Sequence, residues 1–243
     1  MTAPAPRIVA IGGGGFASTP DSPLIDYVLG AAEKPRPRVC FVPTAGGDAL
    51  PYVALFYRAC LARDCEPSDL PLFDRTGEDV REKLLAQDVI WVGGGNTANM
   101  LAIWRIHGVD LAMREAWESG IVLSGSSAGM ICWFEASITD SFGPQMAPLD
   151  DGLGFLPGSA CPHYDSQAAR RPVYHEALAN GFPAGYAADE QVALRFDGTE
   201  LAECVTGLEG HFAWRVERNG EGVVVERPLP TRLLRAAGAL PPD

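Results

Sequence analysis

Residues 121–129 read IVLSGSSAG, an aliphatic run followed by a turn of serine and glycine. Such a short, continuous apolar run is typical of a strand that is buried on both faces of a sheet. Gly125, Ser127 and Gly129 then form the pattern Gly-x-Ser-x-Gly, whose glycines allow a sharp turn from strand to helix with the serine hydroxyl exposed above the sheet. The pattern favours Ser127 as a nucleophile, with the N–H of Ala128 directed at an oxyanion.

Three similar aliphatic runs precede this turn, at Arg7–Ile11, Arg38–Val42 and Val89–Val92. The segments between the runs space their apolar residues as helices do, at Pro23–Glu33, Ala49–Ala62, Glu78–Ala86, Thr97–Ile106 and Val109–Glu118. Strands that alternate with helices predict an α/β fold with a doubly wound, mostly parallel sheet and helices on both faces.

The second half of the chain has a different pattern. Residues 137–170 are rich in proline, glycine and aspartate, which predicts an ordered loop, and we hypothesise that this loop forms a lid. After a helix come extra short C-terminal strands, with Asn219-Gly220 as a hairpin turn between the last two. The helix is expected at Arg171–Asn180 and the strands at Val192–Phe196, Leu201–Val205, His211–Val216 and Gly222–Glu226. No linker or repeat divides the chain, so we predict a single domain over 1–243 with a frayed tail at about 236–243.

Composition excludes several classes of protein. The 243 residues carry 31 acidic and 19 basic side chains, a net charge of −12, and 47% of them are hydrophobic, as in an ordinary globular protein. The acidic charge argues against nucleic acid and anionic membrane as partners, because both need a basic surface. The chain has no apolar run of ~18 residues and no signal-peptide pattern, and its six cysteines form no CxxC pair. We therefore expect a cytoplasmic protein with reduced thiols.

Two glycine runs follow predicted strands. The run Gly12–Gly15 departs from a dinucleotide fingerprint, since no helix follows at once and no acidic residue ends the second strand, so a tight turn is favoured. In the second run, Gly93–Gly95, successive N–H groups can point at one oxyanion, although a plain turn would use the same residues. Asn96 and Thr97 can cap the helix that follows. No motif has the spacing of metal ligands, and no cofactor is predicted.

A nucleophilic serine needs a base, and the chain has four histidines. His107 ends a predicted helix, His175 lies within one, and His211 begins a strand. His163 lies in a proline-bounded loop, where catalytic groups concentrate, so we favour it over His211. A carboxylate would complete the triad, and residue type alone does not rank the candidates Asp140, Asp150, Asp151, Asp165, Asp189 and Glu190.

Three blocks together resemble the peptidase E (aspartyl dipeptidase) and cyanophycinase family of serine peptidases. They are Val92–Thr97, Gly125–Gly129 and Cys161–Tyr164, and the resemblance covers roughly residues 7–215. It implies a fold like that of class I glutamine amidotransferases. It also implies Ser127 as nucleophile, His163 as base and Glu190 as the third catalytic residue, with Asp140 as a contributor to the site. The oxyanion N–H groups would come from Gly94 or Gly95 together with Ala128.

The same resemblance implies a dipeptidase that prefers an N-terminal aspartyl residue and takes a small peptide as its partner; it leaves a homodimer open. Arg170 and Arg171 are candidates for the cation that an acidic side chain needs, although two exposed arginines at a helix start fit equally well. Trp133 and Phe134 are larger than the residues expected there in aspartyl dipeptidases, which leaves other small dipeptides and β-aspartyl substrates open.

Two other functions fit parts of the pattern. An α/β-hydrolase-type esterase would use Ser127, Asp189 and His211, but the chain lacks an HGGG-type oxyanion segment. A non-hydrolytic sensor of a small ligand could use the same sheet edge, but the intact pair of Ser127 and His163 argues against it.

Overall fold

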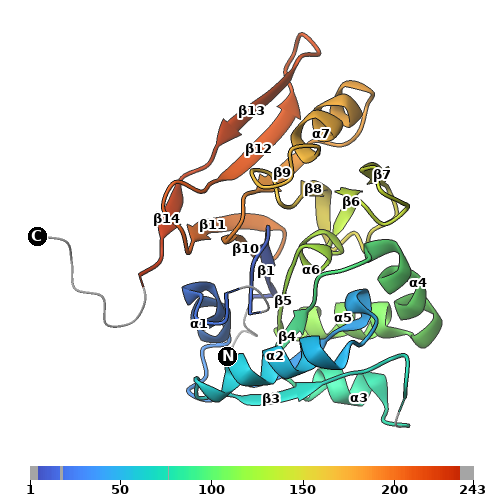
Figure 1. Ribbon diagram of the computed structural model, residues 1–243, viewed down its shortest axis with the longest axis vertical. Coiled ribbons are helices and arrows are strands. Elements are labelled where there is room, and N and C mark those ends of the chain that lie inside the picture. Colours follow the sequence, from blue (N-terminus) through green and yellow to red (C-terminus); the bar gives the residue numbers. More distant parts are fainter. Residues whose placement is uncertain (1–4, 17–18, 76, 236–243) are drawn as a thin grey trace, which may run out of the picture.

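The computed structural model describes residues 5–16, 19–75 and 77–235. The fold of these residues is built on two β-sheets (Figure 1). The strands of the larger sheet lie in the order β14-β11-β10-β1-β5-β4-β2-β3. Neighbours from β1 to β3 are parallel, whereas β10 runs antiparallel to both β1 and β11. These strands are β1 (Arg7–Ile11), β2 (Arg38–Val42), β3 (Glu66–Asp69), β4 (Val89–Val92), β5 (Val122–Ser126), β10 (Val192–Asp197), β11 (Glu200–Thr206) and β14 (Thr231–Leu233).

Helices cover both faces of the larger sheet, as the alternation of strands and helices predicted. Along β1, Ile8 and Ala10 point into one apolar core, whereas Val9 and Ile11 point into the other. Helices α3 to α6 line the first core, and α1 and α2 line the second. The helices are α1 (Pro23–Gly30), α2 (Leu50–Leu61), α3 (Val80–Leu85), α4 (Thr97–His107), α5 (Val109–Glu118) and α6 (Ala128–Ile131), with a short 3-10 helix η1 (Thr44–Gly46).

The smaller sheet has the order β13-β12-β9-β8-β6-β7 and packs against helix α7 (Arg170–Ala179). Strand β8 is parallel to β6 and β9, and the remaining pairs are antiparallel. In Figure 1, α7 lies beside the hairpin of β12 and β13, which it contacts. The strands are β6 (Phe134–Thr139), β7 (Ala147–Leu149), β8 (Leu156–Cys161), β9 (Gly185–Ala188), β12 (Ala213–Arg218) and β13 (Val224–Pro228).

Strands β6, β7 and β8 correct the prediction of a loop over residues 137–170. Strand β8 reads LPGSAC, which has neither β-branched residues nor the alternation that marks a strand in a sequence. Its pairing with β9 depends on close approach of two backbones, since a Cβ atom on Gly185 would lie 1.8 Å from the carbonyl oxygen of Ser159. Within this range, residues 140–146, 150–155 and 162–169 lie outside regular elements, and the last of these segments contains His163.

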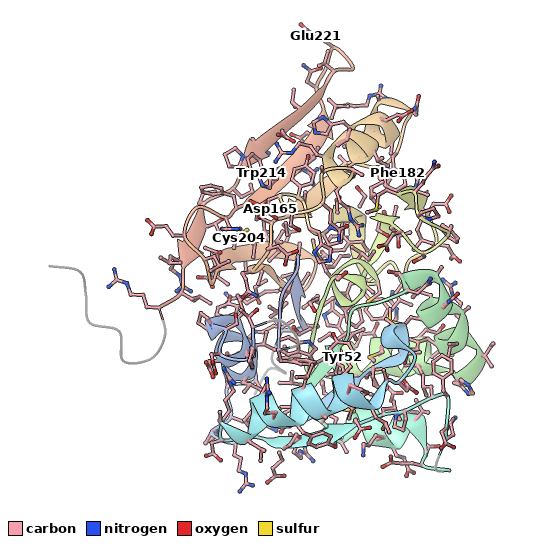
Figure 2. The ribbon with its side chains drawn as sticks, in the orientation of Figure 1. Tyr52, Asp165, Phe182, Cys204, Trp214 and Glu221 are labelled. Atoms are coloured by element: carbon pink, nitrogen blue, oxygen red, sulfur yellow. The ribbon has the colours of Figure 1, made fainter. Side chains whose placement is uncertain are left out.

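The short C-terminal strands are confirmed, but they divide between the sheets. Strands β10 and β11 extend the larger sheet, and β12 and β13 belong to the smaller one. The turn after Arg218 has five residues, with Asn219 Oδ1 accepting hydrogen bonds from the N–H groups of Glu221 and Val223. Glu221 lies at the tip of this hairpin (Figure 2). The tail predicted to fray, at about 236–243, lies outside the described residues. No helix within the described ranges is long and apolar enough to cross a membrane.

Candidate active site

Ser127 lies on a strained turn between β5 and α6. Its backbone angles are φ 58° and ψ −110°, outside the regions that residues with a Cβ atom prefer. Gly125 and Gly129 allow this turn to pack on β4, because a Cβ atom at either position would lie within 2.5 Å of the carbonyl oxygen of Val92. The Ser127 N–H donates to the carbonyl of Ile11, 3.1 Å away. Ser127 thus lies on a sharp turn from strand to helix, and the helix that follows has a single turn.

His163 and Glu190 complete a hydrogen-bonded chain with Ser127. His163 Nε2 lies 2.9 Å from Ser127 Oγ, and its Nδ1 is hydrogen-bonded to Glu190 Oε1. The Ser166 hydroxyl donates to the same oxygen of Glu190 at 2.8 Å. The hydrogen bond with His163 holds the pKa of Glu190 below its usual range despite partial burial, so the carboxylate is ionised at neutral pH. An ionised carboxylate on Nδ1 leaves Nε2 free to accept the proton of Ser127.

The run of glycines after β1 brings His163 and Glu190 together. The N–H of His163 donates to the carbonyl of Gly12, and that of Gln191 donates to Gly13, both at 3.1 Å. A Cβ atom on Gly13 would lie 2.1 Å from the Glu190 carboxylate, so only glycine leaves space for it. The run therefore forms hydrogen bonds with the loops that follow β8 and β9. The sequence favoured a tight turn at this run over a nucleotide-binding site.

A polar pocket of about 390 Å³ opens beside Ser127. Its size lies within the range of sites for small molecules. The lining residues are Gly95, Asn96, Ser127, Asp140, His163, Gln167 and Arg170.

Arg170 and Arg171 face different surroundings. Arg170 is buried, with one guanidinium nitrogen donating to the carbonyl of Ile138 and Nε donating to Gln167 Oε1. Its remaining nitrogen lies 3.9 Å from the Asp140 carboxylate and makes no hydrogen bond within the described residues. Burial lowers the pKa of Arg170, but a guanidinium stays charged at neutral pH.

Arg171, by contrast, does not line the pocket. Its guanidinium lies over the rings of Tyr164 and Trp214, at 4.4 and 5.0 Å from the ring centroids, and is paired with Glu226. The structure therefore brings only one of the two candidate arginines to the site.

Of the predicted oxyanion donors, Gly95 lines the pocket directly. The Gly94 N–H instead donates to the hydroxyl of Tyr52 at 3.0 Å, a contact that the sequence did not reveal. The N–H groups of Gly95 and Ala128 make no hydrogen bond to any group in the described ranges. Ala128 directly follows Ser127 in the chain, and Gly95 lines the same pocket as Ser127, so both N–H groups are candidates for binding a ligand.

Asn96 and Thr97 connect the pocket to the segment that carries Asp140. Asn96 caps α4 as predicted, since its side-chain oxygen accepts from the N–H of Asn99, while its amide nitrogen donates to the carbonyl of Ser141. The N–H of Thr97 donates to the Ser141 hydroxyl. These contacts fix Asp140 at the rim of the pocket.

The residues of the rival esterase arrangement do not meet at Ser127. His211 Nε2 lies 3.2 Å from Asp165, whose other oxygen accepts from the Glu190 N–H. Asp189 accepts hydrogen bonds from Phe212 N and Trp214 Nε1, and burial raises its pKa. Both residues therefore support the loop of Glu190 without contacting Ser127.

The remaining candidates lie apart from the pocket. Asp151 is paired with Arg105 at the surface, and His175 with Glu226. Trp133 and Phe134 are fully buried in the apolar core, so their bulk does not narrow the pocket. Asp150 is exposed and, like His107, is absent from the pocket lining.

Three residues at the site were missed from the sequence. Ser166 and Gln167 follow His163 within one turn of chain, and that proximity is the signal that could have identified them. Tyr52 lies 42 positions before Gly94, and no local pattern links the two. Within the described ranges, no group of three or more His, Cys, Asp or Glu side chains could hold a metal, and all six cysteines are buried and unpaired.

The lowered pKa of Glu190 predicts a dependence of stability on pH. A carboxyl with a folded-state pKa below its ordinary 4.5 stabilises the fold above that pH, and this contribution is lost as the pH falls through the lower value. We expect the free energy of unfolding of the unmodified protein to fall more steeply on acidification than that of Glu190→Gln. Urea unfolding at a series of pH values measures both slopes, and equal slopes would contradict the assignment.

The chain is similar to several known proteins. The family model of peptidase family S51 matches residues 8–204. A protein of Bacillus subtilis (strain 168) named "Uncharacterized peptidase YgaJ" is 46% identical over 230 residues, which cover 94% of this chain and 99% of that protein.

Two solved structures have similar folds. One, a peptidase from an acI-B1 Actinobacterium, has a TM-score of 0.72 and 17% identity, covering 94% of this chain and 96% of that one. The other, a candidate peptidase E protein from Listeria monocytogenes EGD-e, has a TM-score of 0.61 and 18% identity, covering 93% of this chain and 100% of that one.

Proposed function

Because this chain belongs to peptidase family S51, we propose that it is a serine-type dipeptidase that prefers an aspartyl residue at the N-terminus of its substrate. The observation that carries this proposal is the hydrogen-bonded chain of Ser127, His163 and Glu190 beside a small pocket that contains a buried arginine. No membrane surface or nucleic acid is part of the proposal, and the partner is a small peptide.

The proposed reaction proceeds through an acyl-enzyme. Ser127 Oγ attacks the peptide carbonyl while His163 Nε2 accepts the hydroxyl proton, and the Glu190 carboxylate stabilises the imidazolium that forms. His163 then donates this proton to the leaving amine as the C–N bond breaks. A water molecule, deprotonated by the same imidazole, hydrolyses the ester and regenerates Ser127. The oxyanion of each tetrahedral intermediate would accept hydrogen bonds from Gly95 and Ala128.

Arg170 and Asp140 support the preference for an N-terminal aspartyl residue. The guanidinium nitrogen of Arg170 that has no other partner can donate to the β-carboxylate of the substrate. The Asp140 carboxylate at the rim, half exposed, can accept hydrogen bonds from the α-ammonium group of the same residue. A dipeptide with N-terminal aspartate presents both groups, and its short length suits a pocket of about 390 Å³.

A panel of peptides tests the proposed function. Release of free amino acids from Asp-Leu, Ala-Leu, Leu-Asp and β-Asp-Arg is compared with hydrolysis of short acyl nitrophenyl esters. We expect Asp-Leu to have the highest kcat/KM of the panel. Efficient ester hydrolysis by folded protein without turnover of any peptide would contradict the proposal and favour the esterase.

Replacement of Arg170 separates specificity from catalysis. We expect Arg170→Gln to lower kcat/KM for Asp-Leu by about 10- to 100-fold, because one charge-assisted hydrogen bond to the substrate carboxylate is lost. Hydrolysis of Ala-Leu, which has no such carboxylate, should change by less than about threefold. Arg171→Gln is the matched control, since this neighbour does not line the pocket. An equal loss on both substrates would show that Arg170 supports the fold of the site and does not read the substrate.

A further inference from the structure

Tyr52 connects helix α2 to the glycine loop beside the nucleophile. Its hydroxyl accepts a hydrogen bond from the Gly94 N–H at 3.0 Å. The ring packs against Phe16 and Phe41, with centroids 5.5 and 5.0 Å away. Tyr52 lies on helix α2, which covers one face of the larger sheet, and is labelled in Figure 2. Burial raises the pKa of the hydroxyl, so Tyr52 is neutral at physiological pH.

Two glycines make room for the Tyr52 ring. A Cβ atom on Gly46 would lie 3.1 Å from a ring carbon of Tyr52, and one on Gly93 would lie 3.0 Å from another. The ring therefore packs closely against both η1 and the loop after β4. With its ring held in this way, the hydroxyl is a fixed acceptor for Gly94.

The loop from Gly93 to Asn96 is held by hydrogen bonds from N–H groups on both sides of Gly95. Gly94 donates to Tyr52, and Asn96 donates to the carbonyl of Ala45 at 2.8 Å. Between them Gly95 has φ +140°, and a Cβ atom there would lie 2.1 Å from the Ala45 oxygen. This conformation leaves the Gly95 N–H without a partner in the described part of the chain, at a residue that lines the pocket.

We propose that Tyr52 is a positioning residue for catalysis, whose hydroxyl holds the glycine loop so that the N–H of Gly95, and not that of Gly94, completes the oxyanion hole with Ala128. The loop is close enough for this role, since a Cβ atom on Gly94 would lie 3.4 Å from Ser127 Cβ. The proposal deepens the proposed function and rests on it. Because the oxyanion hole binds charge that develops only in the transition state, Tyr52 should affect kcat more than substrate binding.

Tyr52→Phe removes the hydroxyl and keeps the ring. The Gly94 N–H then loses its acceptor, and the loop can shift the Gly95 N–H away from the oxyanion. We expect kcat for Asp-Leu to fall by about tenfold or more, with KM within about twofold of its original value. Tyr57→Phe is the matched control, because Tyr57 lies on the same helix and its hydroxyl donates to Asp69, away from the pocket. Tyr57→Phe should leave both kcat and KM for Asp-Leu unchanged.

A second measurement keeps the test independent of peptide turnover. A fluorophosphonate forms a bond between its phosphorus and Ser127 Oγ as fluoride leaves and His163 takes the proton, and its phosphoryl oxygen occupies the oxyanion hole. We expect Tyr52→Phe to slow this labelling by a factor similar to that in kcat. Unchanged kcat and labelling in Tyr52→Phe, or equal losses in Tyr57→Phe, would overturn the role of Tyr52. If the unmodified protein is labelled but hydrolyses no peptide, the proposed function fails, and the labelling rates of the two variants still decide the role of Tyr52.

Discussion

Ser127→Ala is expected to lower kcat for Asp-Leu by about 10⁴-fold or more while the protein keeps its fold. The substitution removes only the oxygen that attacks the peptide carbonyl and that lies 2.9 Å from His163. Alanine retains the Cβ atom, so the strained backbone of the elbow is neither relieved nor worsened. Release of free leucine measures the activity, and circular dichroism with thermal unfolding measures the fold.

A second substitution at this position tests whether the loss of activity could instead result from a loss of folded protein. Ser127→Gly should also be inactive, but glycine accepts a φ of 58° with this ψ, so the protein should gain about 1 kcal/mol in free energy of unfolding. An inactive and more stable variant separates catalysis from folding. Activity in either variant within tenfold of the unmodified protein would eliminate Ser127 as the nucleophile.

His163→Asn is expected to cost about as much as loss of Ser127, because without a base the hydroxyl is a poor nucleophile. Asparagine is chosen because it tolerates the positive φ of 53° at this position better than most residues. The double variant of Ser127→Ala with His163→Asn should lose no more than about twofold beyond Ser127→Ala alone, since the two residues act as one unit. Losses that multiply in the double variant would contradict a shared step.

His211→Asn is the matched control for His163→Asn. His211 contacts Asp165, which holds the N–H of Glu190, but it does not contact Ser127. We therefore expect a loss within about tenfold, through the position of Glu190. A large loss in His211→Asn together with full activity in His163→Asn would instead favour the esterase arrangement.

The alternation of strands and helices in the larger sheet followed from local patterns. Strands β1, β2 and β4 have the predicted bounds, and α5 does as well. These strands are buried on both faces, so their residues must be continuously apolar, and that requirement is visible in the sequence. The smaller sheet was not predicted over residues 137–170, because the pairing of β8 is between distant segments and its sequence has no strand pattern.

The candidate nucleophile and its surroundings were also visible locally. A serine between two glycines directly after a buried strand predicts a sharp turn of the backbone, and the structure has that turn at Ser127. The proline-bounded loop favoured His163 as the base, and the family resemblance implied Glu190 as the third residue; the two lie in hydrogen-bonding contact with each other. Their catalytic roles stay predictions until the variants above are measured.

Tertiary structure alone decided between neighbours of the same type. Arg170 and Arg171 are consecutive on a helix, so they point about 100° apart, and only the packing of α7 determines that Arg170 enters the pocket. Glu190 and Asp189 are consecutive in a loop, and the hydrogen bond from Gln191 to Gly13 turns Glu190 toward His163. The N–H of Gly94 or of Gly95 could face an oxyanion until Tyr52, far away in the sequence, engages the first. Local patterns express what one segment needs in order to form; which side chain of a pair faces a site depends on contacts between segments that no local pattern records.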